Sequence, residues 1–119
     1  MNKYEKGKCG EDIVCKYLIE KGYLVIERNY RGKKGEIDII ARDGNAIVFI
    51  EVKSWKTIPV SEAEFSLSSM KKRRMINSAE QYIFENSKKI SNFDIRFDFV
   101  FVDAAKNKIA HSKNIIMES

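Results

Sequence analysis

Charged side chains stand inside two apolar, strand-like stretches of this chain. Gly35–Ile40 reads GEIDII and carries Asp38, whereas Ile47–Trp55 reads IVFIEVKSW and carries Glu51 and Lys53. Burying an isolated charge is costly, and two carboxylates brought to one spot also repel each other. A divalent cation relieves that repulsion, and a lysine beside it can act on a phosphate that the metal receives. The residue types therefore indicate metal-assisted chemistry on a phosphate ester.

A hairpin is expected to bring the two stretches together. Glu36–Arg42 and Ala46–Trp55 are rich in β-branched residues and are predicted to be strands. Asp43-Gly44-Asn45 between them is typical of a tight turn that joins antiparallel strands. Because alternate side chains of a strand share a face, we expect Glu36 on the same face as Asp38. The structural alternative is a plain ion pair across a half-exposed sheet face.

Further helices and strands are expected on either side of this hairpin. Apolar residues at helical spacing predict two helices, and Gly22 stands where the first helix should be capped. Glu11 lies at the edge of the apolar stripe of that helix and leans toward its core side. The order helix, three strands, helix, two strands predicts an α/β fold with a mixed sheet flanked by helices, in one domain over residues 1–119. The expected bounds are Gly7–Lys21 and Ser68 or Ser69 to Asn86 for the helices, Tyr23–Asn29, Ile95–Val102 and Lys108–Ser112 for the other strands, and Tyr30–Gly35 and Lys56–Ser66 for loops.

The composition favours a polyanionic partner such as nucleic acid. The formal net charge is +5 and the pI is about 9.2. No segment resembles a signal peptide or approaches the roughly 20 apolar residues of a membrane span, so we expect a cytoplasmic protein with no membrane partner. Cys9 and Cys15 match neither a zinc site nor a disulfide framework and are interpreted as packing residues. Eight basic residues are expected to contact nucleic-acid phosphates: Arg28, Arg31, Lys33 and Lys34 near the hairpin, and Lys71, Lys72, Arg73 and Arg74 at the start of the second helix.

A family resemblance follows from the motifs. GEID, then EVK about a dozen residues later, preceded by a helix bearing GED, resembles the PD-(D/E)xK nuclease superfamily, with its proline absent. The closest resemblance is to the YraN-like family of small bacterial proteins, which are similar to archaeal Holliday junction resolvases. It covers nearly the whole chain, including ERNYR at Glu27–Arg31, the KKRR run and RFD at Arg96–Asp98.

The resemblance implies a restriction-endonuclease-like fold and a metal-dependent nuclease. Its motif positions fall on Asp38, Glu51, Lys53 and Glu11. Asp38, Glu51 and the backbone carbonyl of Val52 would hold Mg²⁺ or Mn²⁺, with Glu11 binding directly, through water or at a second metal. Lys53 would orient the nucleophile or stabilise charge on the phosphorane. The implied substrate is DNA, above all branched DNA, and resolvases of this kind act as homodimers.

Several alternatives stay open on the sequence alone. One alternative is a catalytically silent nucleic-acid-binding module in DNA processing that keeps the fold and the basic surface. Another is an RNA-directed role, or a scaffold that recruits another enzyme. Glu11 is equally suited to complementing the helix dipole. Asp98 is expected to pair with Arg96 or another basic residue rather than to join the metal. His111 is expected to be structural or exposed, since no second histidine exists to complete a zinc site. Trp55 suits base stacking and sheet-edge packing equally well.

Overall fold

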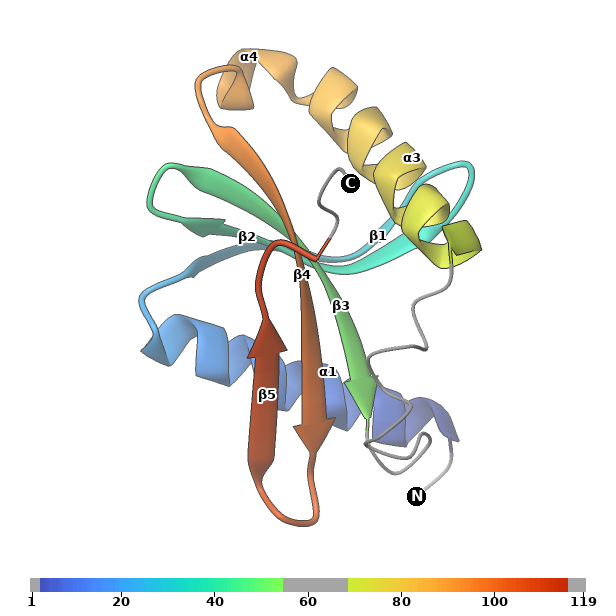
Figure 1. Cartoon of the computed structure of the whole chain (residues 1–119), viewed down its shortest axis with the longest axis vertical. Helices are drawn as coiled ribbons and strands as arrows, with labels where there is room; N and C mark the ends of the chain where they lie inside the picture. The colour runs from blue at the N-terminus through green and yellow to red at the C-terminus, as the bar shows by residue number, and fades with distance from the viewer. Residues whose placement is uncertain (1–2, 55–68, 116–119) are drawn as a thin grey trace.

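A five-stranded mixed sheet organises residues 3–54 and 69–115, which are the residues described by this computed structural model. Its strands lie in chain order, with β3 and β4 parallel and all other neighbours antiparallel. Helix α1 covers one face, and α3 and α4 lie on the other (Figure 1). The predicted α/β fold, a mixed sheet flanked by helices, is confirmed. The bounds are α1 Lys3–Glu20, β1 Leu24–Arg31, β2 Glu36–Asp43, β3 Ala46–Ser54, α3 Ser69–Glu85, α4 Ser87–Ile90, β4 Asp94–Asp103 and β5 Lys108–Ser112.

Helix α1 packs its apolar stripe on the sheet, as its spacing predicts. Val14 and Leu18 are fully buried in a cluster with strand residues, and Cys15 is buried with them. A Cβ added to Gly10 would lie 3.2 Å from Val102 Cγ1, so the missing side chain permits the close approach of helix and sheet. The helix ends as predicted, with Gly22 at a φ of 92°, a conformation that glycine adopts at little steric cost.

The opposite face of the sheet is covered by α3. Phe49 of β3 and Tyr82 of α3 belong to one buried cluster, with ring centroids 5.8 Å apart. Tyr30 joins that cluster, and its hydroxyl donates a hydrogen bond to Glu85 Oε1 at 2.7 Å. The prediction that Tyr30 begins a loop is therefore wrong. Burial of its ring against Tyr82 extends β1 to Arg31.

A buried polar network joins β4 to its neighbours beneath α1. Asp98 is completely buried and accepts hydrogen bonds from Arg96 Nε at 2.9 Å and from the Asn114 backbone N–H at 3.0 Å. His111 Nε2 lies 2.7 Å from Asp98 Oδ2, and His111 Nδ1 lies 2.9 Å from the Tyr17 hydroxyl. The predicted pairing of Asp98 with Arg96 is confirmed, and His111, whose side chain is 5% exposed, is structural.

The remaining element bounds agree with the predicted ones to within a few residues. The short helix α4 was not expected, and the predicted loop at 56–66 and Trp55 lie outside the described residues. Over the ranges that the structure describes, no helix combines the length and the apolar character needed to cross a membrane.

Candidate active site

Strands β2 and β3 part from each other at the predicted site. Their pairing ends at Ile39–Ile50, although β2 begins at Glu36 and β3 continues to Ser54. Beyond that last pair, β2 remains bonded to β1 and β3 remains bonded to β4. Asp38 and Glu51 are the first residues after the last pair. We call this opening, lined by Asp38, Glu51 and Val52, the fork.

Asp38 occupies the fork with its carboxyl group. Its Oδ2 accepts a hydrogen bond from the Val52 backbone N–H at 2.8 Å, which satisfies a donor that β2 no longer pairs. The carboxyl group of Glu51 lies close enough to interact with that of Asp38. Burial and the nearby charge of Glu51 raise the pKa of Asp38 to about 7, against the lowering effect of the Val52 N–H. Two carboxyl groups thus meet here in mutual repulsion.

Lys53 lies two residues after Glu51 on β3 and joins Asp38 and Glu51 at the predicted site. Its Nζ lies 3.7 Å from Glu51 Oε1, and the two side chains are 21% and 17% exposed. An ion-paired carboxylate normally has a lowered pKa, whereas that of Asp38 is raised. The raised pKa of Asp38 therefore argues against the alternative that this residue only forms a cross-strand ion pair.

A local inversion of β1 shapes the other side of the fork. Arg28 pairs with Ile39 and Tyr30 with Ile37, but Asn29 between them has a φ of 53°, in the left-handed region. Ile39 packs in the α1-side cluster and Ile37 in the α3-side cluster. The regular alternation from which a shared face for Glu36 and Asp38 was predicted is therefore broken at this point of β2.

Asn29 connects two acids around this inversion. With its amide nitrogen turned toward the acceptors, it donates to Glu36 Oε1 at 3.2 Å and to Glu11 Oε1 at 3.1 Å. Burial and the charge of Asp38 raise the pKa of Glu11, while Arg28 and Asn29 oppose that rise. Glu11 thus lies within electrostatic reach of Asp38, on the core side of α1 as predicted. Sequence reasoning missed Asn29, whose only signal was that asparagine tolerates positive φ.

Oxygen ligands for a hard cation are present at the fork. The chemistry of Asp38, Glu51 and the Val52 carbonyl suits Mg²⁺ or Mn²⁺, and a cation would relieve the repulsion that raises the pKa of Asp38. Within the described residues, no three histidine, cysteine, aspartate or glutamate side chains are grouped so that they could hold a metal ion. The structure places Glu11 against Asn29 and Arg28, so its role at a metal stays a prediction.

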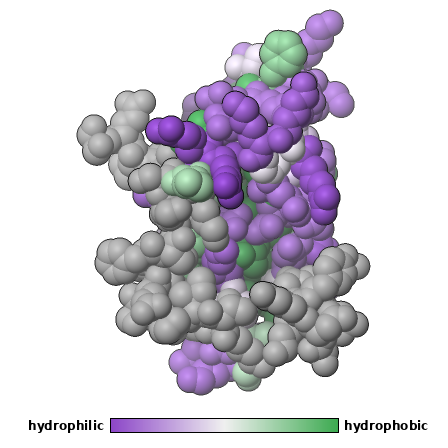
Figure 2. Space-filling model, turned by 90° about the vertical axis from the view of Figure 1, so that its right-hand side faces the viewer, coloured by the Kyte–Doolittle hydropathy of each residue, from purple (hydrophilic) through white to green (hydrophobic). Residues whose placement is uncertain are grey.

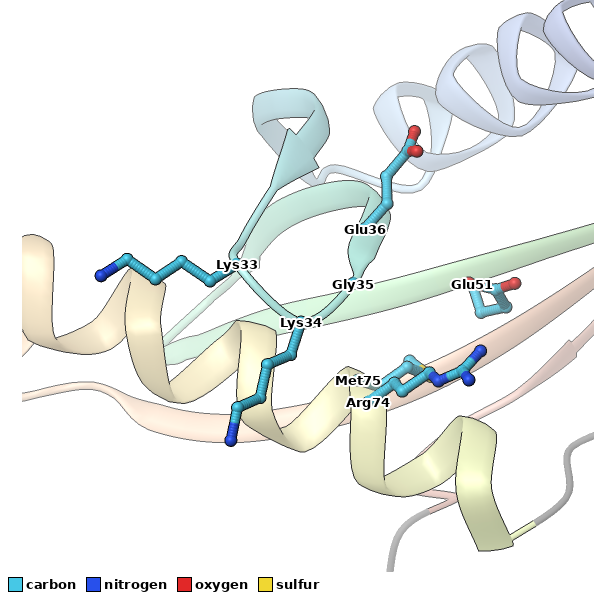
Figure 3. A pocket seen from close by; sticks show the side chains of 7 residues that line it. All are labelled: Lys33, Lys34, Gly35, Glu36, Glu51, Arg74 and Met75. Atoms are coloured by element: carbon cyan, nitrogen blue, oxygen red, sulfur yellow. The ribbon is translucent and has the colours of Figure 1, made fainter.

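A pocket of about 360 Å³ lies between the fork and α3. Figure 3 shows Glu51 across the pocket from Arg74, with Lys33 and Lys34 extending outward from the loop between β1 and β2. The residues that line it are Lys33, Lys34, Gly35, Glu36, Glu51, Arg74 and Met75, of which Gly35, Glu36 and Met75 were not among the predicted site residues.

The other predicted nucleic-acid contacts are more scattered. Arg28 faces α1, where its Nη2 lies 2.7 Å from Asp12 Oδ1 and 3.6 Å from Glu11 Oε1. Arg31 is exposed, with its Nε 3.9 Å from Glu36 Oε2. On α3, Arg73 is exposed and Lys72 is half-buried, and the side chain of Lys71 lies outside the described residues. The structure therefore brings three of the eight predicted cations, Lys33, Lys34 and Arg74, to the pocket.

Residues 10–102 match the model of the uncharacterised protein family UPF0102. The chain belongs to UPF0102. This confirms the predicted resemblance to the YraN-like family. A UPF0102 protein of Clostridioides difficile is 41% identical over 96% of this chain and 98% of its own length. UPF0102 proteins of Sulfurihydrogenibium and Persephonella marina are 42% and 39% identical, each over 96% of this chain and over 96% and 95% of their own lengths.

Proposed function

We propose that this UPF0102 protein is a metal-dependent endonuclease that hydrolyses phosphodiester bonds in branched DNA. The observation that carries the proposal is the fork, where the charge of Glu51 acts on the buried carboxyl group of Asp38 and Lys53 Nζ lies 3.7 Å from Glu51 Oε1. A pair of acids in which one carboxyl group has a raised pKa, beside a half-buried lysine, is a typical signature of a functional site. A function at this site would explain why the chain keeps two repelling carboxyl groups that lower the stability of the fold.

The residues at the fork have separate tasks in this proposal. Asp38, Glu51 and the Val52 carbonyl would hold Mg²⁺ or Mn²⁺, which when bound would polarise the phosphate and lower the pKa of water. Lys53 would orient the attacking water or stabilise the charge that develops on the phosphate oxygens. Glu11, fixed by Arg28 and Asn29, would add negative charge at the rear of the site.

Cations beside the fork would position the DNA. Lys33, Lys34 and Arg74 line the pocket that contains Glu51. Figure 2 shows a largely hydrophilic described surface on the side of the molecule that carries α3 and the β1–β2 loop. Contacts of this kind bind phosphates and give affinity without reading sequence, which suits recognition of DNA shape. Cutting two strands of a junction would require two copies of the chain, so we include a homodimer in the proposal.

A cleavage panel tests the proposal against the silent binding module. Labelled four-way junction, flap and linear duplex are incubated with Mn²⁺ or Mg²⁺ and either the wild type or Glu51→Gln. We expect the wild type to cut branched DNA and Glu51→Gln to bind it without cutting. Glu20→Gln, an exposed acid at the end of α1, serves as the control and should cut normally. Binding without cutting by the wild type, in either metal, would instead establish the silent module.

A further inference from the structure

The β1–β2 loop, residues 32–35, is fixed firmly on α3. Gly32 N–H donates to the Gly35 carbonyl at 2.8 Å, and Lys33 N–H donates to Gln81 Oε1 at 2.8 Å. A Cβ at Gly32 or at Gly35 would lie 3.2 Å from Ser78 Oγ, so both glycines permit close packing on the helix. The two lysines of this loop are therefore carried on a fixed support rather than on a freely moving loop.

A second hollow lies beside this loop. It has a volume of about 330 Å³, within the range of small-ligand sites, and it shares Lys33 and Lys34 with the pocket at the fork. Phe84 lines it and is 82% exposed, the largest exposed fraction among the large hydrophobic side chains in the described ranges. The other lining residues are Asn77, Glu80 and Gln81.

The spacing along α3 suits a nucleic-acid strand. Arg74 lines the first pocket and Phe84 the second, ten residues later in the same helix, which corresponds to about 15 Å along its axis. At about 3.4 Å per nucleotide of a stacked strand, that distance equals roughly four nucleotides. A strand cut at the fork would therefore pass Lys34 and Lys33 and reach Phe84 within a few nucleotides.

We propose that Phe84 stacks on an unpaired base of the DNA, while Lys33 and Lys34 bind the adjacent phosphates. The proposal rests on the proposed function and narrows its substrate to DNA with unpaired nucleotides a few positions from the cut. An exposed aromatic ring beside cations is the arrangement that proteins use to bind single strands. Bases inside a duplex present no free face to such a ring. The carboxylate of Glu80 disfavours a phosphate deep in the hollow and so leaves that space to a base.

Binding measurements separate this stacking from general attraction to phosphate. Fluorescence anisotropy is recorded in EDTA for a duplex and for the same duplex with a short unpaired thymidine tail. We expect Phe84→Ala to bind the tailed DNA roughly 5- to 10-fold more weakly than the wild type and the plain duplex equally well. Ile19→Ala, which removes a 60% exposed side chain from α1 on the other face of the sheet, should change neither affinity. Equal affinities of Phe84→Ala and the wild type for the tailed DNA would overturn the proposal.

Tryptophan fluorescence at position 84 tests the stacking independently of the binding measurements. Trp55 is the only tryptophan, so Phe84→Trp in a Trp55→Phe background places the emission at position 84. Stacking on thymidine should quench that emission, and unchanged emission at saturating DNA would contradict the proposal. Self-association that Phe84→Ala abolishes, with DNA binding unchanged, would assign Phe84 to a protein contact instead. If junction cleavage persists while both tests fail, this inference falls and the proposed function stands.

Discussion

The ionised form of Asp38 destabilises the folded protein. Its pKa of about 7 arises from burial and from the charge of Glu51, so at neutral pH and above the folded chain must hold two ionised carboxylates at the fork. Functional sites commonly carry strain of this kind at the expense of stability. The Val52 N–H offsets only part of the repulsion.

Replacing Asp38 by asparagine should stabilise the metal-free protein. The folded-state pKa is raised from an ordinary value of 3.8, so the stability associated with the neutral carboxyl is complete below about pH 4 and is lost as the pH rises through about 7. Asparagine keeps an acceptor for the Val52 N–H and removes the charge. In urea unfolding with EDTA at pH 8, we expect Asp38→Asn to gain on the order of 1–3 kcal/mol, and less at pH 5. A variant less stable than the wild type at pH 8 would contradict this account of the fork.

Asn29 offers a test of the inversion in β1. Its φ of 53° suits glycine and disfavours alanine, while both substitutions remove the amide that bridges Glu11 and Glu36. Thermal unfolding should therefore show Asn29→Ala to be less stable than Asn29→Gly by about 1 kcal/mol. Because the amide is lost in both variants, the difference between them reports the backbone alone. Equal stabilities would show that the inversion carries no strain for a residue with a Cβ.

At the scale of elements, the Asp98 network ties β4 to β5, to α1 and to the end of β2. Arg96 Nη1 lies 2.9 Å from Asp43 Oδ2, and His111 links Asp98 to Tyr17 of α1. Burial alone would raise the pKa of Asp98, but hydrogen bonds from His111, Arg96 and the Asn114 N–H lower it below its ordinary value. The network thus holds an ionised carboxylate in the core.

Asp98→Asn should destabilise the protein strongly and change its acid unfolding. Because the folded-state pKa is lowered, the carboxylate contributes stability above its unfolded pKa of about 3.8, and this contribution is lost as the pH falls through the folded value. We expect Asp98→Asn to cost about 3 kcal/mol at pH 7 and to lessen the loss of stability between pH 5 and pH 3. Asp94→Asn, an exposed acid on the same strand, is the matched control for denaturant unfolding. An Asp98→Asn cost no larger than that of Asp94→Asn would contradict this role.

Local periodicity was sufficient to predict most elements. The two long helices, α1 and α3, and the hairpin followed from apolar spacing and from the Asp43–Asn45 turn. The alternation of β4 placed Asp98 beside Arg96 on one face. These features depend on residues close in sequence. The acid, acid and lysine set at the fork was predictable for the same reason, because each residue interrupts an apolar strand.

Features that depend on distant partners were not predictable. Tyr30 belongs to β1 because it packs on Tyr82 and bonds Glu85, both more than 50 residues away. Nothing local to Arg28 indicates that it faces acids on α1. Asn29 has a positive φ inside a strand, where periodicity predicts none.

At the scale of the whole molecule, the cations that we propose to bind DNA lie on one side of the sheet. Lys33 and Lys34 stand with Arg74 beside the fork, whereas Arg28 on the α1 side is engaged by Asp12 and Glu11. The positions of the charged residues therefore say more about the DNA-binding side than the net charge of +5 does. DNA should approach from the α3 side.

Removing both loop lysines should weaken DNA binding in a salt-dependent way. Lys33→Ala with Lys34→Ala should lessen the slope of log affinity against log salt concentration by about 2, if each lysine contacts one phosphate. Lys106→Ala with Lys108→Ala removes the same charge from the exposed β4–β5 turn and the exposed first residue of β5, and is the control. Equal slopes for the two double variants would show that only the net charge matters.

The most direct test of the fork is metal-dependent cleavage of a labelled four-way junction by the wild type beside Asp38→Asn. Because this substitution should stabilise the metal-free fold, a loss of activity cannot be ascribed to unfolding, which unfolding curves of the same samples verify. We expect Mn²⁺-dependent cutting by the wild type and at least a 100-fold loss in the variant, on the order of the effect of removing one catalytic group. Undiminished cutting by Asp38→Asn, or no cutting by the wild type, would contradict it.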